Sequence, residues 1–281
     1  MKSILLIGQS NMAGRGTLKD VAPIINENIY MLRNGRFQMM VEPLHNDRPN
    51  AGIGPAASFA LAWIADHPGE SIGLIPCAEG GSAIDEWMPG TPLFRHAVSE
   101  ARFALENGEI SAVLWHQGEN DSLNDLYLSY GEKLETIFEA LRQELGLQNT
   151  PFLVGGLPDF LGQFGYGLYA PQYKEINQVL SDFATTHDNC CFVPAEGLRH
   201  NPDGIHIDAD SQRAFGLRYY DVLAGAPKPI LSAEEAKERL AFLQNRPLSL
   251  KEQFMRDELA YLREEISFDE LQERHQALMK S

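Results

Sequence analysis

Cysteine and long apolar runs are both scarce in this 281-residue sequence. Its three cysteines, Cys77, Cys190 and Cys191, cannot all pair and two of them are neighbours, which excludes the disulfide framework of a small secreted domain. No apolar run approaches the roughly 20 residues that span a bilayer. The run after Lys2 has only about five residues, fewer than the core of a signal peptide. We therefore expect buried thiols in a soluble, cytoplasmic protein.

Basic residues are few compared with acidic ones. The chain has 23 Lys and Arg against 39 Asp and Glu, and its formal net charge is -16. Such a field repels phosphate backbones and anionic lipid surfaces, and no run of Lys or Arg compensates it locally. Neither nucleic acid nor a membrane is expected as a partner.

The sequence does contain a regular alternation of two patterns. Short, nearly continuous apolar runs are typical of strands buried on both faces. They lie at Ser3–Ile7, Ser71–Pro76, Ser111–Trp115, Pro151–Val154 and Cys190–Val193. Helical patterns lie between them, and a further one follows the last run. This alternation predicts an α/β fold with a doubly wound, five-stranded parallel sheet, whose ligands bind beyond the carboxyl ends of the strands.

One segment near the start interrupts the alternation. Ile29–Leu32 and Arg36–Val41 flank Asn34-Gly35, a pair that suits a two-residue hairpin turn. We expect a small β-hairpin that projects beside the first strand.

The C-terminal part follows a different pattern from Lys228 onward. Ser232, Ser249 and Ser267 each stand three residues before a glutamate, as in the capping box that begins a helix. We expect a catalytic domain at residues 1–227 and a helical extension at 228–281. An apolar face on the second of these helices suits packing on the domain or on a second copy of the chain.

Two polar segments follow the first and last predicted strands. Gly8-Gln9-Ser10-Asn11-Met12 places a serine hydroxyl at the carboxyl edge of the sheet, where a serine by itself is more often a helix cap than a nucleophile. Asp203 and His206 stand three residues apart and supply the base and the orienting carboxylate that a nucleophilic serine requires. Alone, they would form an ordinary turn. Together, the two segments predict a Ser-His-Asp triad.

Two other strand ends suit an oxyanion hole. Gly80-Gly81-Ser82 follows the second strand, and Gln117-Gly118-Glu119-Asn120-Asp121 follows the third. A glycine lets a backbone N–H approach a developing oxyanion closely, and an amide side chain supplies another donor. Each segment alone reads equally well as a loop between strand and helix.

Taken in their order along the chain, the four segments resemble the ordered sequence blocks of SGNH hydrolases. They are most similar to the sialate O-acetylesterase and acetylxylan esterase-like group, carbohydrate esterase family 6. The resemblance covers roughly residues 3–224 and leaves the C-terminal helices outside. It implies a flavodoxin-like three-layer α/β/α sandwich, no metal or other cofactor, and a serine esterase that removes acetyl groups from carbohydrates.

The resemblance also implies a role for individual residues. Ser10 is the nucleophile, His206 the base and Asp203 its orienter, while the backbone N–H groups of Ser10 and Gly80 stabilise the oxyanion. For the third donor, Gln117 fits the closer family, whereas Asn120 fits the Gly-x-Asn-Asp pattern of the wider superfamily. We expect Gln117 to be this donor, with Asn120 as the alternative or as a contact to the sugar.

Further residues near these positions are candidates for substrate contacts or for support of the site. They are Gln9, Asn11, Arg15, Gly81 and Glu119. Arg15 and Glu119 are expected to pair with each other behind the site.

Three other functions remain open from the sequence. The chain suits a carbohydrate-binding protein without activity, a lipase or thioesterase of the same superfamily, or a metal hydrolase with His200, His206 and Asp208 as ligands. The loop Phe160–Tyr169 fits either a sugar platform or an acyl channel. The identity of the sugar and the oligomeric state are not predicted.

Overall fold

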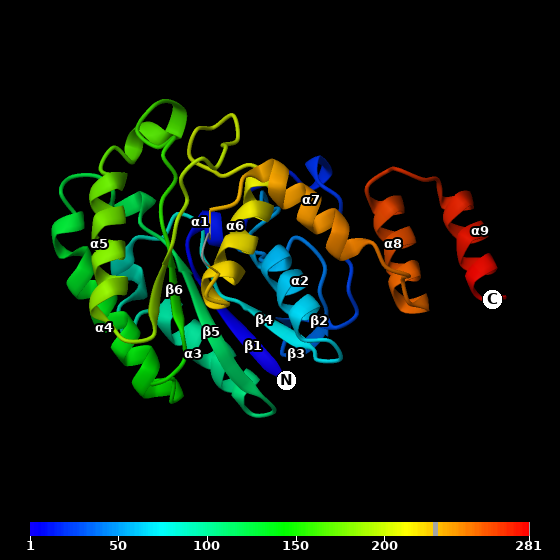
Figure 1. The fold of residues 1–281 in the computed structure, drawn as a ribbon, viewed down its shortest axis with the longest axis horizontal. Helices are drawn as coiled ribbons and strands as arrows, with labels where there is room; N and C mark the ends of the chain where they lie inside the picture. Colours follow the sequence, from blue (N-terminus) through cyan, green and yellow to red (C-terminus); the bar gives the residue numbers. More distant parts are fainter. Residues whose placement is uncertain (227–229, 281) are drawn as a thin grey trace.

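The structure is a computed structural model that describes residues 1–226 and 230–280. Its centre is a seven-stranded sheet in the order β3-β2-β4-β1-β5-β6-β7 (Figure 1). The strands are β1 (Lys2–Gly8), β2 (Ile29–Arg33), β3 (Arg36–Met39), β4 (Ile72–Pro76), β5 (Glu109–His116), β6 (Phe152–Gly155) and β7 (Cys190–Val193). The predicted boundary between residues 227 and 228 lies outside the described residues.

The α/β fold is confirmed, but the prediction of a five-stranded, all-parallel sheet is wrong. β2 pairs in parallel with β4, and β3 pairs antiparallel with β2, so the sheet is mixed and has two more strands. The predicted hairpin turn does form, since Asn34 and Gly35 both have positive φ. However, Ile29 and Met31 of β2 are fully buried, so this hairpin extends the sheet instead of projecting from it.

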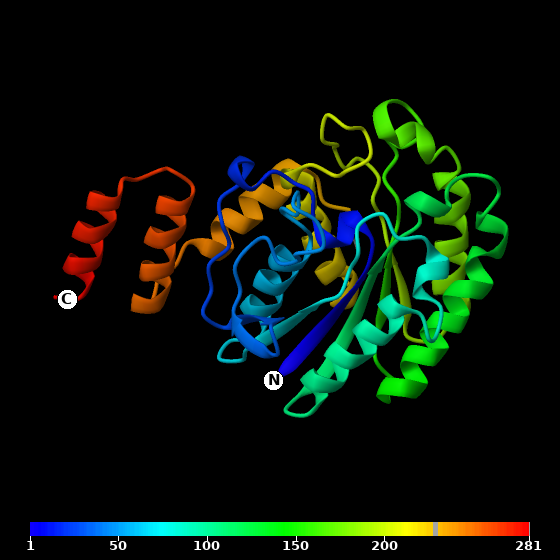
Figure 2. The same ribbon diagram turned by 180° about the vertical axis from the view of Figure 1, so that it is seen from behind.

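Helices cover the sheet in two groups. α2 (Ala56–Asp66) packs on α6 (Ala209–Leu223), while α3 (Pro92–Leu105), α4 (Tyr127–Leu145) and α5 (Tyr173–Thr186) form the other group. Figures 1 and 2 show the sheet between these groups. The four apolar residues Ile4–Ile7 of β1 are fully buried, as expected of a strand enclosed on both faces.

The C-terminal helices are α7 (Ala233–Gln244), α8 (Leu250–Leu262) and α9 (Phe268–Leu278). All three begin with the predicted capping box, at Ser232, Ser249 and Ser267. α7 packs on α6, whereas α8 and α9 lie beside each other and project from the body (Figures 1 and 2). Association of two copies through these helices stays a prediction.

Two further observations bear on the composition of the chain. No helix in the described ranges is long and apolar enough to cross a bilayer. Cys77, Cys190 and Cys191 are free; the first two are buried and the third is half-buried. Burial raises the pKa of each thiol above its usual value.

The strand order determines where a ligand can bind. After β4 the chain passes over β1 and continues on its other side with β5, so the order reverses at β1. Ligands bind beside such a reversal, beyond the carboxyl ends of the strands. The loops after β1, β4 and β5 meet at this edge.

Candidate active site

Ser10 follows β1 at the reversal point of the sheet. Gly8 has a φ of 134°, and a Cβ there would lie 2.1 Å from the carbonyl oxygen of His116, so the turn requires glycine. The N–H of Gln9 donates to the same carbonyl at 2.8 Å. Ser10 then begins the short helix α1 (Ser10–Ala13). Local backbone geometry thus places the serine at the carboxyl edge of the sheet.

Asp203 and His206 lie on the loop before α6 and contact each other directly. Asp203 Oδ2 lies 2.7 Å from His206 Nδ1, and Asp203 Oδ1 accepts the N–H groups of Ile205 and His206 at 3.0 Å each. Burial opposes ionisation of Asp203, but these hydrogen bonds outweigh it and hold the pKa of the carboxyl below its usual value. The contact occupies Nδ1 and leaves Nε2 for a second partner.

Ser10 and His206 line one cavity of about 360 Å³. Its walls come from the segments after β1, β4 and β5, from the loop before α2, from the segment between β6 and α5, and from the loop before α6. The other lining residues are Gln9, Arg15, Arg48, Asn50, Gly80, Gly81, Asn120, Tyr166 and Ile205. The structure therefore brings together residues from six separate parts of the chain.

The cavity differs in charge from the chain as a whole. Two arginines and no carboxylate line it, although the chain carries a net charge of -16. Arg15 is buried and held by Asp47. Arg48 is about half exposed, pairs with Glu79 at 2.8 Å and donates to the carbonyl oxygen of Gly80. Both arginines of the lining are thus already paired with carboxylates, and only Arg48 keeps part of its guanidinium exposed at the cavity.

The predicted pair of Arg15 and Glu119 is wrong. Arg15 binds Asp47, whereas Glu119 Oε1 accepts a hydrogen bond from Asn11 at 2.6 Å and lies 3.2 Å from His116 Nε2. Arg15 and Glu119 are both buried, and a buried charge requires a polar or oppositely charged partner nearby. Nothing in the sequence next to Asp47 indicates that it reaches Arg15.

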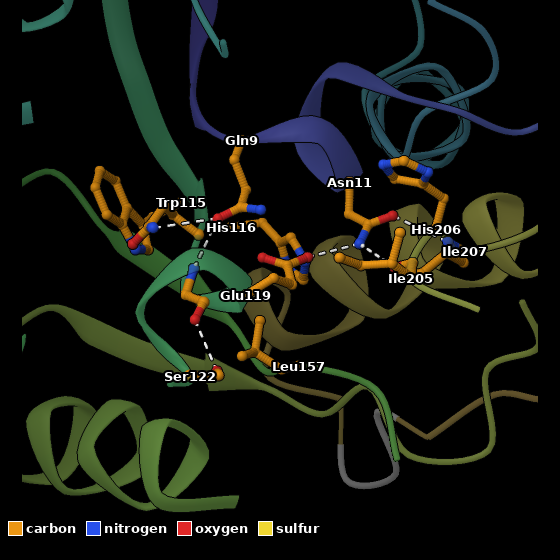
Figure 3. Close-up of polar contacts among 12 residues, drawn as sticks. Gln9, Asn11, Trp115, His116, Glu119, Ser122, Leu157, Ile205, His206 and Ile207 are labelled. Atoms are coloured by element: carbon orange, nitrogen blue, oxygen red, sulfur yellow. Dashed lines mark hydrogen bonds and ion pairs between the residues drawn. The ribbon is translucent and has the colours of Figure 1, made fainter. Parts of the chain in front are cut away.

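Asn11 connects three segments of the site (Figure 3). Its Nδ2 donates to Glu119 and to the carbonyl oxygen of Ile205 at 3.2 Å, and its Oδ1 accepts the N–H of Ile207 at 2.9 Å. Burial raises the pKa of Glu119, but the charge and hydrogen bond of His116 and the hydrogen bond of Asn11 lower it below its usual value. An ionised Glu119 thus orients Asn11. Asn11 directly follows Ser10 and holds the loop of His206 through Ile205 and Ile207.

The hydrogen bonds argue against Gln117 as the third oxyanion donor. Gln117 is fully buried, and its Nε2 lies 3.1 Å from Gln9 Oε1, 3.1 Å from the Ser82 carbonyl oxygen and 2.5 Å from Asp121 Oδ2. Its amide hydrogens are therefore engaged away from the cavity. Asn120 is exposed and lines the cavity, where its Nδ2 donates to the carbonyl oxygen of Gly81.

The hydrogen bonds also argue against the backbone N–H of Gly80 as an oxyanion donor. Gly80 lines the cavity, but its backbone N–H donates to Asp47 Oδ2 at 2.8 Å. A Cβ at Gly80 would collide with the Arg15–Asp47 pair, so the glycine allows this pair to approach the backbone. Gly80 thus supports the wall of the cavity in this structure.

Several lining residues were not predicted from the sequence. Arg48 and Asn50 belong to an irregular loop, and Asp47 supports the same wall from behind. Tyr166 was included only within the range Phe160–Tyr169. None of these residues stands in a motif, so their approach to Ser10 is visible only in three dimensions.

The alternative metal ligands have separate roles. His206 contacts Asp203, His200 packs against Phe164, and Asp208 caps α6 by accepting the N–H of Ser211. Within residues 1–226 and 230–280, no three His, Cys, Asp or Glu side chains form a group suited to hold a metal ion.

Most of the chain matches a known protein family. Residues 1–224 match the sequence model of the family described as carbohydrate esterase, sialic acid-specific acetylesterase. The chain belongs to this family of carbohydrate esterases. The esterase is thus a carboxylic ester hydrolase, as predicted from the four sequence segments, and α7 to α9 lie beyond the matched region.

Two curated relatives resemble the esterase in sequence. The probable carbohydrate esterase At4g34215 of Arabidopsis thaliana is 33% identical over 236 residues, covering 76% of this chain and 86% of its own. The probable 9-O-acetyl-N-acetylneuraminic acid deacetylase of Escherichia coli K12 is 30% identical over 117 residues, covering 33% of this chain and 35% of its own. The X-ray structure of the Arabidopsis protein matches with a TM-score of 0.71 at 28% identity, covering 80% and 98% of the two chains.

Proposed function

We propose that the esterase removes O-acetyl groups from carbohydrates with Ser10 as nucleophile, His206 as base and Asp203 as the residue that orients the base. The observation that carries this proposal is the Asp203–His206 contact on the same cavity as Ser10. A serine hydroxyl requires such a base, and the base requires a carboxylate.

The proposed reaction has two halves. Ser10 Oγ attacks the acetyl carbonyl while His206 Nε2 accepts the hydroxyl proton, and His206 then returns this proton to the departing sugar oxygen. In the second half, His206 removes a proton from water, which attacks the acetyl-Ser10 ester; acetate is released as His206 returns the proton to Ser10 Oγ. The ionised carboxylate of Asp203 holds Nδ1–H in both halves and stabilises the imidazolium.

The oxyanion is stabilised in this proposal by Ser10 and Asn120. The N–H of Ser10 stands at the first residue of α1, where a helix leaves its N–H groups without an intrahelical acceptor. One hydrogen of the Asn120 amide donates to the Gly81 carbonyl oxygen, and the other supplies the second donor to the oxyanion. This replaces Gln117 and Gly80, whose N–H groups are engaged elsewhere.

Of the two substrate types left open by the sequence, we propose the sialate type. Sialic acids carry a carboxylate, whereas an acetylated xylan chain is neutral. Arg48 lines the cavity and is about half exposed, so in this proposal the carboxylate of the sugar binds the exposed part of its guanidinium, beside Glu79. The Escherichia coli relative is described as a deacetylase of an acetylated sialic acid, which supports the same class.

The proposal also includes the layering of the fold and the division of the chain into domains. The five strands predicted from the sequence lie in the order second, first, third, fourth, fifth, which supports a flavodoxin-like layering. The family match ends at residue 224, which supports a catalytic domain at residues 1–227 with a C-terminal extension at 228–281.

Acetate release from a panel of substrates tests the function. We expect the highest kcat/KM on O-acetylated sialic acid, a lower value on acetylated xylo-oligosaccharides, and measurable turnover of 4-nitrophenyl acetate. Turnover of 4-nitrophenyl esters that increases with acyl-chain length, with no acetate released from either sugar, would instead identify a lipase or thioesterase.

The two candidate oxyanion donors should respond differently to replacement. Asn120→Ala is expected to lower kcat about 100-fold with little change in Tm, because Asn120 is exposed. Gln117→Ala is expected to lower Tm, because it leaves the buried carboxylate of Asp121 without one of its donors. If Gln117→Ala lost kcat at an unchanged Tm and Asn120→Ala kept it, Gln117 would be the donor after all.

A further inference from the structure

We propose that Tyr166 forms the platform on which the ring of the acetylated sugar stacks. This inference rests on the proposed function and assigns the residue that distinguishes a sugar ester from a simple ester. Tyr166 lines the cavity that contains Ser10 and His206. It lies on a short 3-10 helix, Gly165–Tyr169, between β6 and α5.

The segment that carries Tyr166 is docked on the catalytic loop through its backbone. The N–H of Tyr166 donates to the carbonyl oxygen of Asp203 at 2.8 Å. A Cβ at Gly165, whose φ is 56°, would lie 2.3 Å from that same oxygen, and a Cβ at Gly167 would lie 2.2 Å from the carbonyl oxygen of Gly204. Two glycines therefore permit a close approach that positions Tyr166 relative to Asp203.

Other aromatic residues anchor the segment that carries Tyr166. The rings of Phe160 and Phe164 pack against His200, with centroids 5.2 and 4.6 Å away. Phe160 is buried, whereas the side chains of Tyr166 and Tyr169 are 64% and 67% exposed. The segment thus buries Phe160, leaves Phe164 partly exposed at 36%, and presents Tyr166 and Tyr169 more fully to solvent.

Exposed aromatic surface beside a cavity points to a ligand. Large apolar groups left in water give up the stabilisation of burial, and clusters of them on a protein surface commonly mark binding sites. Leu168 is also exposed in this segment, at 56%. Because Tyr166 belongs both to this surface and to the catalytic cavity, a ligand bound for reaction at Ser10 reaches its ring.

The chemistry of the cavity fits a sugar rather than an acyl chain. A pyranose ring has an apolar C–H face, which packs on an aromatic ring, and a rim of hydroxyl groups, which need polar partners. The cavity offers such partners in Arg48, Asn50 and Asn120. An acyl channel would need an enclosed apolar lining, whereas Tyr166 is open to solvent. Of the two uses predicted for this loop, the structure therefore favours the sugar platform.

A comparison of two substrates across three variants tests the inference. The substrates are the best acetylated sugar from the panel and 4-nitrophenyl acetate, which has no sugar ring. The variants are Tyr166→Ala, Tyr166→Phe and the matched control Tyr169→Ala, an equally exposed tyrosine of the same segment that does not line the cavity. The measured quantity is kcat/KM for the sugar ester divided by kcat/KM for the simple ester.

Tyr166→Ala should lower this ratio about tenfold or more, mainly through a higher KM for the sugar ester. Tyr166→Phe should keep the ratio within about threefold of the parent, because the ring remains, and Tyr169→Ala should keep it as well. An unchanged ratio in Tyr166→Ala, an equal fall in Tyr166→Phe, or an equal fall in Tyr169→Ala would each overturn the platform. If the parent released no acetate from any sugar, the proposed function would fail first.

Discussion

Replacement of Ser10 by alanine is expected to abolish acetyl-ester hydrolysis, with a loss of several powers of ten in kcat. The variant lacks the oxygen that attacks the ester, and neither His206 nor the oxyanion donors can replace it. Removing one oxygen atom at the edge of a cavity leaves the packing of β1 unchanged, so Tm should stay close to that of the parent. Steady-state kinetics and thermal unfolding measure the two effects.

A serine-reactive probe supplies the control for this experiment. A fluorophosphonate should modify the parent at Ser10 and leave Ser10→Ala unmodified, which mass spectrometry of the tryptic peptides detects. The matched control is Ser129→Ala, a half-buried serine on α4 outside the cavity, and this variant should be labelled and active like the parent. Near-parental turnover by Ser10→Ala would show that another residue is the nucleophile.

Asp203→Asn is expected to lower kcat by about 10³ to 10⁴ although the side chain hardly changes in size. The amide lacks the negative charge that stabilises the imidazolium, and its NH₂ group can hold His206 in the wrong tautomer. The lowered pKa of Asp203 means that its carboxylate is ionised at and above neutral pH. We expect the activity of the parent to fall in acid, because a general base must be neutral to accept the proton of Ser10.

The same pKa shift predicts the dependence of stability on pH. The pKa of Asp203 is lower in the folded chain than in the unfolded chain, so its ionised form stabilises the fold above the unfolded value. This contribution is lost as the pH falls through the folded value, and Asp203→Asn should lack it.

Two measurements check the assignment of Asp203. A pH profile of kcat/KM records the acid limb of the parent, and urea unfolding of both proteins records stability against pH. An Asp203→Asn variant as active as the parent, together with a parental profile that lacks an acid limb, would contradict a working Asp203–His206 pair.

Features that depend on neighbours in the chain could be predicted from the sequence alone. Apolar runs located β1, β4, β5, β6 and β7, Asn34-Gly35 located a hairpin turn, and three Ser-x-x-Glu patterns located the starts of α7, α8 and α9. The Asp203–His206 contact belongs to the same class, because both residues lie on one loop, three positions apart. Strand periodicity and loop geometry are local, so they can be predicted without a fold.

The partner of each buried polar group depends on the tertiary structure. Asp47 approaches Arg15 and the N–H of Gly80 from an irregular loop without a motif, and that contact displaced the expected Arg15–Glu119 pair. Gln117 and Asn120 are three residues apart, yet one is buried in a network and the other lines the cavity. Partners of this kind lie far apart in sequence and are selected by burial, because an unpaired polar group in the interior is costly. Their identity therefore depends on how the whole chain packs.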